Sequence, residues 1–583
     1  MRQPSQAARK HPGSVSAFLS ASMASSDPPH TLLNLVHSDL GLRSLSRNER
    51  LALGALCLCT LALLAALQHN RVFFGDEIGT LKYLKESPTY ILTHFSTWLS
   101  MNYFILAERG VAGLCRAADW RLTLLPMAGA IAMIPLTALL ALKLTGSKHT
   151  ALIAAGLTAF NPYLVAWGPV IRAYSLLVAF SLLTINEFFN WAQCQNWWSG
   201  VRCAVAVLLL LLIHLTGTYT VAFIILLLAG EAISAAWSGD RTFLWRAKTL
   251  WLPLALVAML LSIAYWRLFP DIAKINREWG TDTPPTSMAY LPGVFTMYMG
   301  IGYASFLPGL LLLVGCWSAV RKKRALLLLC GAIILTPLLM SLQGVSVPAR
   351  AYARYLIFLL PLLLILIAEG IDWFARHVWM RRATIVAWIL TALIVACWTP
   401  YIRWQFLAQK TWPYGRVGKF LHTHMEASDV IVAGSAIGFT LSQFFDRPED
   451  RIMLPDSYVN KIANRLDAPL KGRVFYVTGL AALNNRTAFI RRFGQAEVAI
   501  YRGNTARALL QEWREDLLHR TGGRVHVGFQ SDYQLLALLE ERLPSGQSAD
   551  HWRSLAERCR AQSPAARDVP RHLEQASQAV IFP

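Results

Sequence analysis

The stretch LALGALCLCTLALLAALQHNRVFFGDE, residues 51–77, decides the fold class of this chain. An apolar run leads up to Phe74, and the acidic pair Asp76–Glu77 follows after a single glycine. An apolar run of this length predicts a helix that spans a membrane. Two carboxylates at the exit of such a helix need water or positively charged partners, so the pair is a candidate functional site by default.

The whole chain has the composition of a multi-pass membrane protein. It has 583 residues, 55% of them hydrophobic, and a mean hydropathy of +0.40. Further apolar runs follow the first one along the chain, and together they predict about eleven membrane spans. The expected spans are residues 51–67, 122–144, 151–165, 174–191, 203–215, 221–237, 250–268, 301–320, 325–342, 355–371 and 384–398.

Basic residues indicate how the chain is oriented. The net charge is +21, and much of the positive charge lies in loops that an alternating path places on one side, such as residues 321–324 and 376–382. By the positive-inside rule this side is the cytoplasm. We therefore expect a multi-pass protein of the cytoplasmic membrane with a cytoplasmic N-terminus. Contact with anionic lipid headgroups accounts for the basic loops, so no nucleic-acid partner is expected.

The fold class that follows is a mainly α polytopic membrane protein with a C-terminal α/β domain. Residues 1–48 are expected to be a flexible cytoplasmic tail, residues 49–400 the transmembrane domain, and residues 401–583 an extracytoplasmic domain. In the last region, strands are expected at 429–436, 473–480 and 496–502, and helices at 416–424, 505–520 and 552–562.

An outer loop, residues 75–121, is expected to connect the first two spans. Residues 78–83 and 90–108 have apolar side chains at helical spacing, which is typical of helices that lie in the membrane interface. Trp98, Tyr103 and Phe104 would then lie at the depth of the lipid headgroups.

Three groups of residues carry the candidate chemistry, all on the predicted outer side. The acidic pair is the first, and the other two are arginine–tyrosine sets at helix ends, where a guanidinium group fits phosphate oxygens in a forked geometry. The candidate residues are Asp76, Glu77, Lys85, Arg172, Tyr174, Arg350, Arg354 and Tyr355.

Each group also has a structural interpretation. The acids could be hydrated carboxylates at a helix end, and the arginines could anchor helices at the interface. His214, at another outer helix end, is more typical of a histidine satisfied by its neighbours. Nothing in the sequence matches a zinc site, a phosphate-binding loop or a nucleophile elbow, so the chemistry must depend on carboxylates and cations.

These motifs resemble those of the C-superfamily membrane glycosyltransferases. Residues 74–77, Phe-Gly-Asp-Glu, are similar to the family's acidic motif, and residues 172–176, Arg-Ala-Tyr-Ser-Leu, to its Arg-x-Tyr-Ser motif. Residues 353–356 resemble a late span of the bacterial relatives of protein O-mannosyltransferases and lipid A aminoarabinose transferases. The sequence departs from the family at residues 101–104, Met-Asn-Tyr-Phe, where many relatives have a Pro-Pro-Leu-Tyr-like stretch.

The resemblance implies an enzyme that uses a sugar linked to a polyprenyl phosphate. Asp76 would act as the general base on an acceptor hydroxyl, with Glu77 orienting it or binding the acceptor. The arginines, the tyrosines and Lys85 would bind the donor phosphate, and attack from the opposite face predicts inversion at the anomeric carbon. No metal ligand or cofactor is assigned, and the need for a divalent ion stays open.

Two other classes of protein stay open at this stage. A transporter or flippase of a lipid-linked sugar would also have many spans and charges around a cavity, although the sequence has no repeated halves. A non-catalytic scaffold would leave the carboxylates and arginines unexplained. The sequence names neither the sugar nor the acceptor, which could be a cell-envelope glycan, a lipid or a protein hydroxyl.

Overall fold

The computed structural model describes the transmembrane region and parts of the C-terminal region. The described residues are 37, 40–68, 75–84, 86–94, 101–115, 119–238, 241–271, 291–300, 303–321, 326–342, 353–410, 413–427, 429–433, 441, 444–445, 452–453, 474–478, 489–493 and 496–501.

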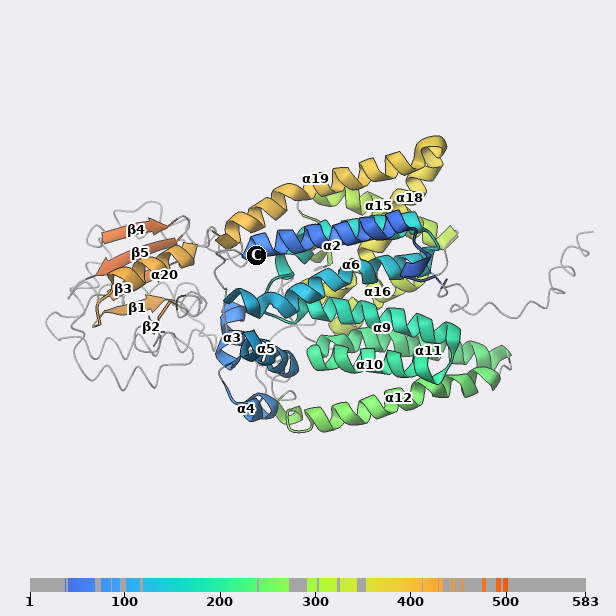
Figure 1. The fold of residues 1–583 in the computed structure, drawn as a ribbon, viewed down its shortest axis with the longest axis horizontal. Coiled ribbons are helices and arrows are strands. Elements are labelled where there is room, and N and C mark those ends of the chain that lie inside the picture. Colours follow the sequence, from blue (N-terminus) through green and yellow to red (C-terminus); the bar gives the residue numbers. More distant parts are fainter. Residues whose placement is uncertain are drawn as a thin grey trace, which may run out of the picture.

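Long helices form a bundle in which most helices run roughly side by side (Figure 1). The bundle helices are α2 (Arg47–Gln68), α6 (Leu124–Thr145), α7 (Lys148–Phe160), α8 (Pro162–Trp167), α9 (Tyr174–Cys194), α10 (Trp197–Ile213), α11 (Thr218–Ser238), α12 (Arg241–Tyr265), α14 (Leu291–Met299), α15 (Tyr303–Arg321), α16 (Leu327–Leu342), α18 (Leu360–Val378) and α19 (Ala383–Lys410).

Among the described residues, 8 helical segments are long and apolar enough to cross a membrane. They are Arg47–Gln68, Arg121–Thr145, Tyr174–Cys194, Leu215–Trp237, Ala247–Tyr265, Tyr303–Arg321, Ile357–Val378 and Met380–Arg403. Three further expected spans form shorter helices, namely α7 with α8, α10 and α16. The chain is thus a multi-pass α-helical membrane protein, and the count of about eleven spans stays a prediction.

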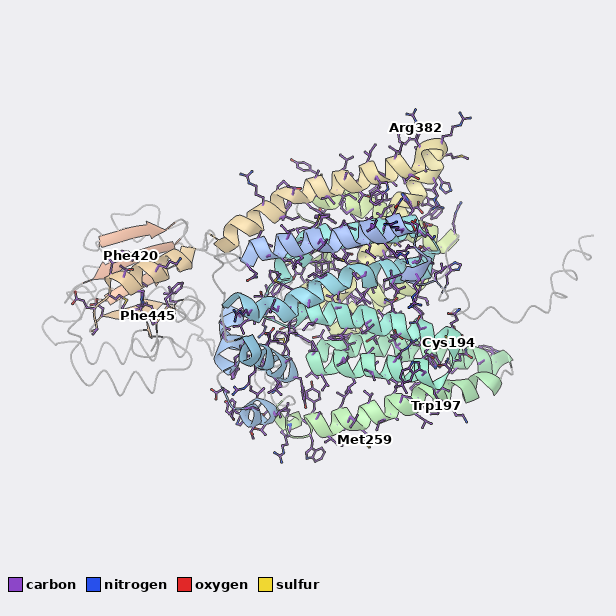
Figure 2. All side chains as sticks on the ribbon, viewed as in Figure 1. Cys194, Trp197, Met259, Arg382, Phe420 and Phe445 are labelled. Carbon is purple, nitrogen blue, oxygen red and sulfur yellow. The ribbon has the colours of Figure 1, made fainter. Side chains whose placement is uncertain are left out.

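The outward faces of the bundle are apolar, as contact with lipid requires. Met259 on α12 is 53% exposed, and Figure 2 shows it on the outer surface of the bundle. Leu58 on α2 and Phe306 on α15 are 67% and 73% exposed. Such exposure would be costly in water for so many large side chains but costs nothing against lipid tails.

Helix α18 forms the centre of the bundle and crosses α15 at two glycines. A methyl group on Gly370 would collide with the carbonyl of Leu311, and one on Gly315 would collide with the carbonyl of Leu366. Small residues at such a crossing allow two backbones to approach closely, which strengthens van der Waals packing between helices in a membrane.

A buried polar cluster ties the N-terminus of α7 to α18. The Asp372 carboxylate accepts hydrogen bonds from Thr150 Oγ1 at 2.9 Å and from Ser147 Oγ at 3.3 Å. It also contacts His149 Nδ1 at 3.1 Å and Arg376 Nη2 at 2.8 Å. Because several donors satisfy it, this carboxylate can stay inside the protein.

That cluster lies at the end of the bundle away from α3, α4 and α5. Arg382, at the turn between α18 and α19, lies at this end together with Cys194 and Trp197 from the turn between α9 and α10 (Figure 2). The turns between α9 and α10 and between α18 and α19 thus lie at the same end of the bundle, as an alternating path requires.

The described residues between α2 and α6 form the helices α3 (Gly75–Leu84), α4 (Pro88–Thr93) and α5 (Asn102–Cys115), followed by the 3-10 helix η3 (Asp119–Thr123). The expected single helix 90–108 was wrong, because α4 ends at Thr93 and its cap His94 has an extended backbone. The Asn102 side chain joins the two pieces by donating hydrogen bonds to the carbonyls of Ile91 and His94.

The expected depth of Phe104 at the lipid headgroups stays a prediction, and the structure shows what its side chain contacts. Phe104 is fully buried and packs with Ile105 on α5 against Ala173 and Leu176 of the bundle. Tyr103 is half-buried, and its hydroxyl donates to the carbonyl of Ala264 at 3.2 Å. The apolar face of α5 therefore packs on protein. Trp98 lies outside the described residues.

A small mixed sheet lies beyond the end of the bundle that carries α3 to α5 (Figure 1). Its strands are β1 (Val430–Ala433), β2 (Ile452–Met453), β3 (Val474–Thr478), β4 (Phe489–Phe493) and β5 (Ala496–Tyr501), in the order β2-β1-β3-β5-β4. β1 pairs in parallel with β2 and β3, and β5 pairs antiparallel with β3 and β4.

The three expected strands correspond to β1, β3 and β5, and the expected helix 416–424 corresponds to α20 (Pro413–His424). The sequence missed β2, which has two residues, and β4, whose FIRRF sequence carries two arginines. The expected helices 505–520 and 552–562 lie outside the described residues.

Candidate active site

The acidic motif lies on α3, directly against the loop that carries Arg172. Glu77 is fully buried, and its Oε1 accepts a hydrogen bond from the backbone amide of Ile171 at 2.8 Å. One turn further along α3, Thr80 Oγ1 accepts a hydrogen bond from Arg172 Nη1 at 3.4 Å. Two motifs that are about 95 residues apart in sequence therefore meet through two hydrogen bonds on one face of α3.

Residues that cap helix α8 set the position of the loop that carries Arg172. Asn161 caps α8 by accepting hydrogen bonds from the amides of Tyr163 and Leu164, and Pro162 occupies the first turn. α8 ends at Trp167, and the chain turns through residues 168–173 before α9 begins at Tyr174. Capping side chains and an N-terminal proline fix where a helix starts, so this stretch sets the position of Arg172.

Arg172 itself is an arginine held inside the protein. It is 6% exposed, and its Nε has no hydrogen-bond partner among the residues that the structure describes. A buried guanidinium group is costly unless its donors are satisfied. An anionic ligand that accepts from Nε would satisfy it, because phosphate oxygens suit the forked donors of arginine.

Arg354 approaches the same place from a distant part of the chain. Arg172 and Arg354 both interact electrostatically with the imidazole of His214. Arg354 also interacts with the hydroxyl of Tyr163, and its guanidinium carbon lies 5.4 Å from the centre of the Tyr355 ring. We call Arg172, Arg354, His214, Tyr163 and Tyr174 the arginine–aromatic cluster.

Aromatic contacts hold this cluster together. The Tyr174 ring is 4.9 Å from the Trp167 ring and 5.6 Å from the His214 ring, measured between centroids. The Tyr163 ring meets the Tyr298 ring edge to face at 5.0 Å. Edge-to-face contacts of this kind add specific geometry to apolar burial.

The backbone next to Arg354 is fixed by the same framework. The Tyr298 hydroxyl donates to the carbonyl of Ala353 at 2.7 Å, and the Tyr298 carbonyl accepts from Asn161 Nδ2 at 2.9 Å. Asn161 therefore connects the cap of α8, which positions Arg172, to the segment that leads into Arg354. Satisfied buried networks of this kind hold side chains in one arrangement.

The structure brings together some of the predicted site residues, and others lie outside the residues that it describes. Glu77, Arg172, Tyr174, Arg354 and Tyr355 are described, and all five belong to the contacts given above. The backbone of Asp76 lies in the first turn of α3 beside Glu77, and its side chain is outside the described atoms. Lys85 and Arg350 lie outside the described residues.

Two features of the site were not assigned from the sequence. His214 was interpreted as satisfied by its neighbours, and its Nδ1 does accept from the amide of Thr216. No pattern in the sequence indicated that both arginines would act on it electrostatically. Asn161 has no motif of its own. Within the described part of the chain, no group of three or more His, Cys, Asp or Glu side chains could hold a metal ion.

The fold and the cluster define a class: a polytopic membrane protein with acidic and arginine motifs joined at one end of its helix bundle. The fold is similar to that of ArnT from Cupriavidus metallidurans bound to undecaprenyl phosphate, with a TM-score of 0.51 and 12% sequence identity. That match covers 78% of this chain and 98% of the other. The chain thus has a fold similar to that of ArnT.

The same protein in the apo state is also similar, with a TM-score of 0.49 and 12% identity over 77% of this chain and 97% of the other. No protein-family model and no curated protein matches the chain.

Proposed function

We propose that this protein is an inverting glycosyltransferase that moves a sugar from a polyprenyl-phosphate donor to a hydroxyl acceptor. The observation that carries the proposal is the contact between the acidic motif and the arginine loop, through Glu77 with Ile171 and Thr80 with Arg172. This transfer needs a base for the acceptor proton and a cation for the leaving phosphate, and a carboxylate and a guanidinium group at one place provide both. The similar fold of ArnT, whose crystal structure holds undecaprenyl phosphate, supports the class of donor.

In the proposed reaction, Asp76 takes the proton from the acceptor hydroxyl, which then attacks the anomeric carbon. A positioned general base typically contributes about 10²–10⁴-fold to the rate. The bond from the sugar to the phosphate breaks, and the polyprenyl phosphate leaves with an added negative charge. Arg172 and Arg354 stabilise that charge, since preorganised cations act most strongly where charge develops. Attack from the face opposite the phosphate inverts the anomeric carbon.

The other residues of the site have supporting roles in this proposal. Glu77 holds the Arg172 loop against α3, so it keeps the base and the phosphate-binding groups at a constant separation. Lys85, Arg350, Tyr174 and Tyr355 provide further donors to the phosphate. Because the leaving group is a monophosphate, the proposed reaction does not require a divalent ion that bridges two phosphates. Dependence on a metal ion stays open.

The proposed topology follows from the two ends of the bundle. The end with the basic loops faces the cytoplasm, and the end with α3, α4 and α5 faces the outer side of the cytoplasmic membrane. Residues 401–583 would then form an extracytoplasmic domain next to the site, where a large acceptor could reach it. Membrane lipids surround the bundle.

The test uses the full chain in proteoliposomes with a radiolabelled polyprenyl-phosphate sugar and an extract of cell-envelope acceptors. We expect Asp76→Asn to lower sugar transfer by about 10²-fold or more, because amide cannot take the proton. Glu86→Gln, which removes a nearby carboxylate from the connection between α3 and α4, is the matched control and should retain activity. Transfer by Asp76→Asn at the wild-type rate, or lipid flipping without any transfer, would refute the proposal.

A further inference from the structure

His214 lies where α10 ends and the 3-10 helix η4 (Leu215–Gly217) begins, and its environment is unusual for a helix cap. It is 7% exposed, and its Nδ1 accepts a hydrogen bond from the amide of Thr216 at 3.1 Å. The bond satisfies one free amide of η4, which is the ordinary task of a capping side chain. It uses one nitrogen of the ring and leaves the other for a different partner.

The Thr216 bond fixes where the imidazole carries its proton. A ring nitrogen that accepts a hydrogen bond has no proton, so in the neutral ring the proton sits on Nε2. Adding a second proton would break the Thr216 bond and would place a third positive charge beside Arg172 and Arg354. His214 therefore has a neutral ring with an N–H donor at Nε2, and two guanidinium groups act on this ring electrostatically.

The ring is also held in orientation. It lies at 39° to the Tyr174 ring, with 5.6 Å between centroids, and Tyr174 in turn contacts Trp167. Tyr174 follows Arg172 by two residues, so the ring of His214 and the guanidinium group of Arg172 are positioned by one short segment. A donor in a fixed orientation costs little entropy when a ligand arrives.

We propose that His214 is a phosphate-binding residue, whose Nε2–H donates a hydrogen bond to a phosphate oxygen of the lipid-linked donor. The inference rests on the proposed function and adds to it a residue that neither the motifs nor the family resemblance assigned. The two guanidinium groups attract the anion by charge, and the histidine adds a directed bond with no further positive charge. No covalent step involves His214.

The test separates the capping role from the phosphate-binding role. His214→Asn retains a cap, since asparagine is among the best capping residues, but its shorter side chain has no donor at the position of Nε2. His214→Phe retains the ring volume and loses both functions. Binding of undecaprenyl phosphate to the full chain in nanodiscs is measured for both variants, with undecaprenol as the lipid that lacks phosphate and Arg172→Ala as the comparison variant.

We expect both histidine variants to bind undecaprenyl phosphate about ten- to a hundredfold more weakly than wild type, as for the loss of a hydrogen bond to a charged group. Their binding of undecaprenol should not change. If His214→Asn binds the phosphate lipid like wild type while Arg172→Ala binds it weakly, His214 is a cap alone and the proposed function stands. If wild type does not distinguish the two lipids, both the inference and the proposed function are overturned.

Discussion

Glu108 on α5 gives a stability prediction whose size follows from the structure. The residue is fully buried, and neither carboxylate oxygen has a hydrogen-bond partner among the described residues. It lies on the α5 face between Phe104, which packs against Ala173, and Ala112, which packs against Ile171. Burial raises the pKa of Glu108 from 4.5 to about 8. The carboxyl group is therefore neutral in the folded protein at pH 7 and ionised in the unfolded chain.

The sign of the pH dependence follows from proton binding. Between pH 4.5 and about pH 8 the folded state binds a proton that the unfolded state has released, so the free energy of unfolding falls as the pH rises. Each pH unit in this window costs about 1.4 kcal/mol, which gives a total of about 3 kcal/mol at pH 7. Below pH 4.5 both states are protonated and the penalty disappears.

Glu108→Gln removes the titrating group while keeping its size. We expect the variant to be more stable than wild type at pH 7.5, with a Tm higher by about 5 °C. The advantage should shrink steadily toward pH 5. The assay is thermal unfolding of the full chain in detergent across this pH range, followed by intrinsic tryptophan fluorescence.

The matched control is Glu86→Gln, which removes a partly exposed carboxylate between α3 and α4 and should change Tm much less than Glu108→Gln does. A Glu108→Gln advantage that is constant with pH, or that grows toward acid, would show that Glu108 is ionised in the folded protein and would refute the reasoning.

Two further predictions concern packing in the bundle. Gly370→Ala should lower the free energy of unfolding by about 1–3 kcal/mol, because the added methyl group overlaps a carbonyl of α15. The control is Gly331→Ala on α16, where the methyl group meets no atom within 4 Å. This variant should be neutral or mildly stabilising in the same thermal assay. Asp372→Ala should lower the free energy of unfolding by about 3–5 kcal/mol, because buried donors and a guanidinium group lose their acceptor. A loss below 1 kcal/mol would show that the polar cluster between α7 and α18 is dispensable for stability.

Much of the transmembrane architecture could be predicted from local sequence. All of the expected spans correspond to helices, because an apolar run in a membrane must satisfy its backbone hydrogen bonds within the segment and so becomes a helix. The start of α9 at Tyr174 and the strands β1, β3 and β5 followed from the same kind of local pattern. An error occurred where tertiary contacts override that pattern, at His94, where the expected helix divides.

The sequence by itself determined that this is a multi-pass helical membrane protein with acidic and arginine motifs next to the ends of its helices. Only the tertiary structure decided that Glu77 bonds the loop of Arg172 and that Arg354 acts electrostatically on the same histidine as Arg172. It also decided that Glu108 is buried with no hydrogen-bond partner among the described residues. The physical reason is the range of the interactions. Helix formation depends on hydrogen bonds between residues four apart, whereas these contacts join residues far apart in the chain and depend on how the helices pack.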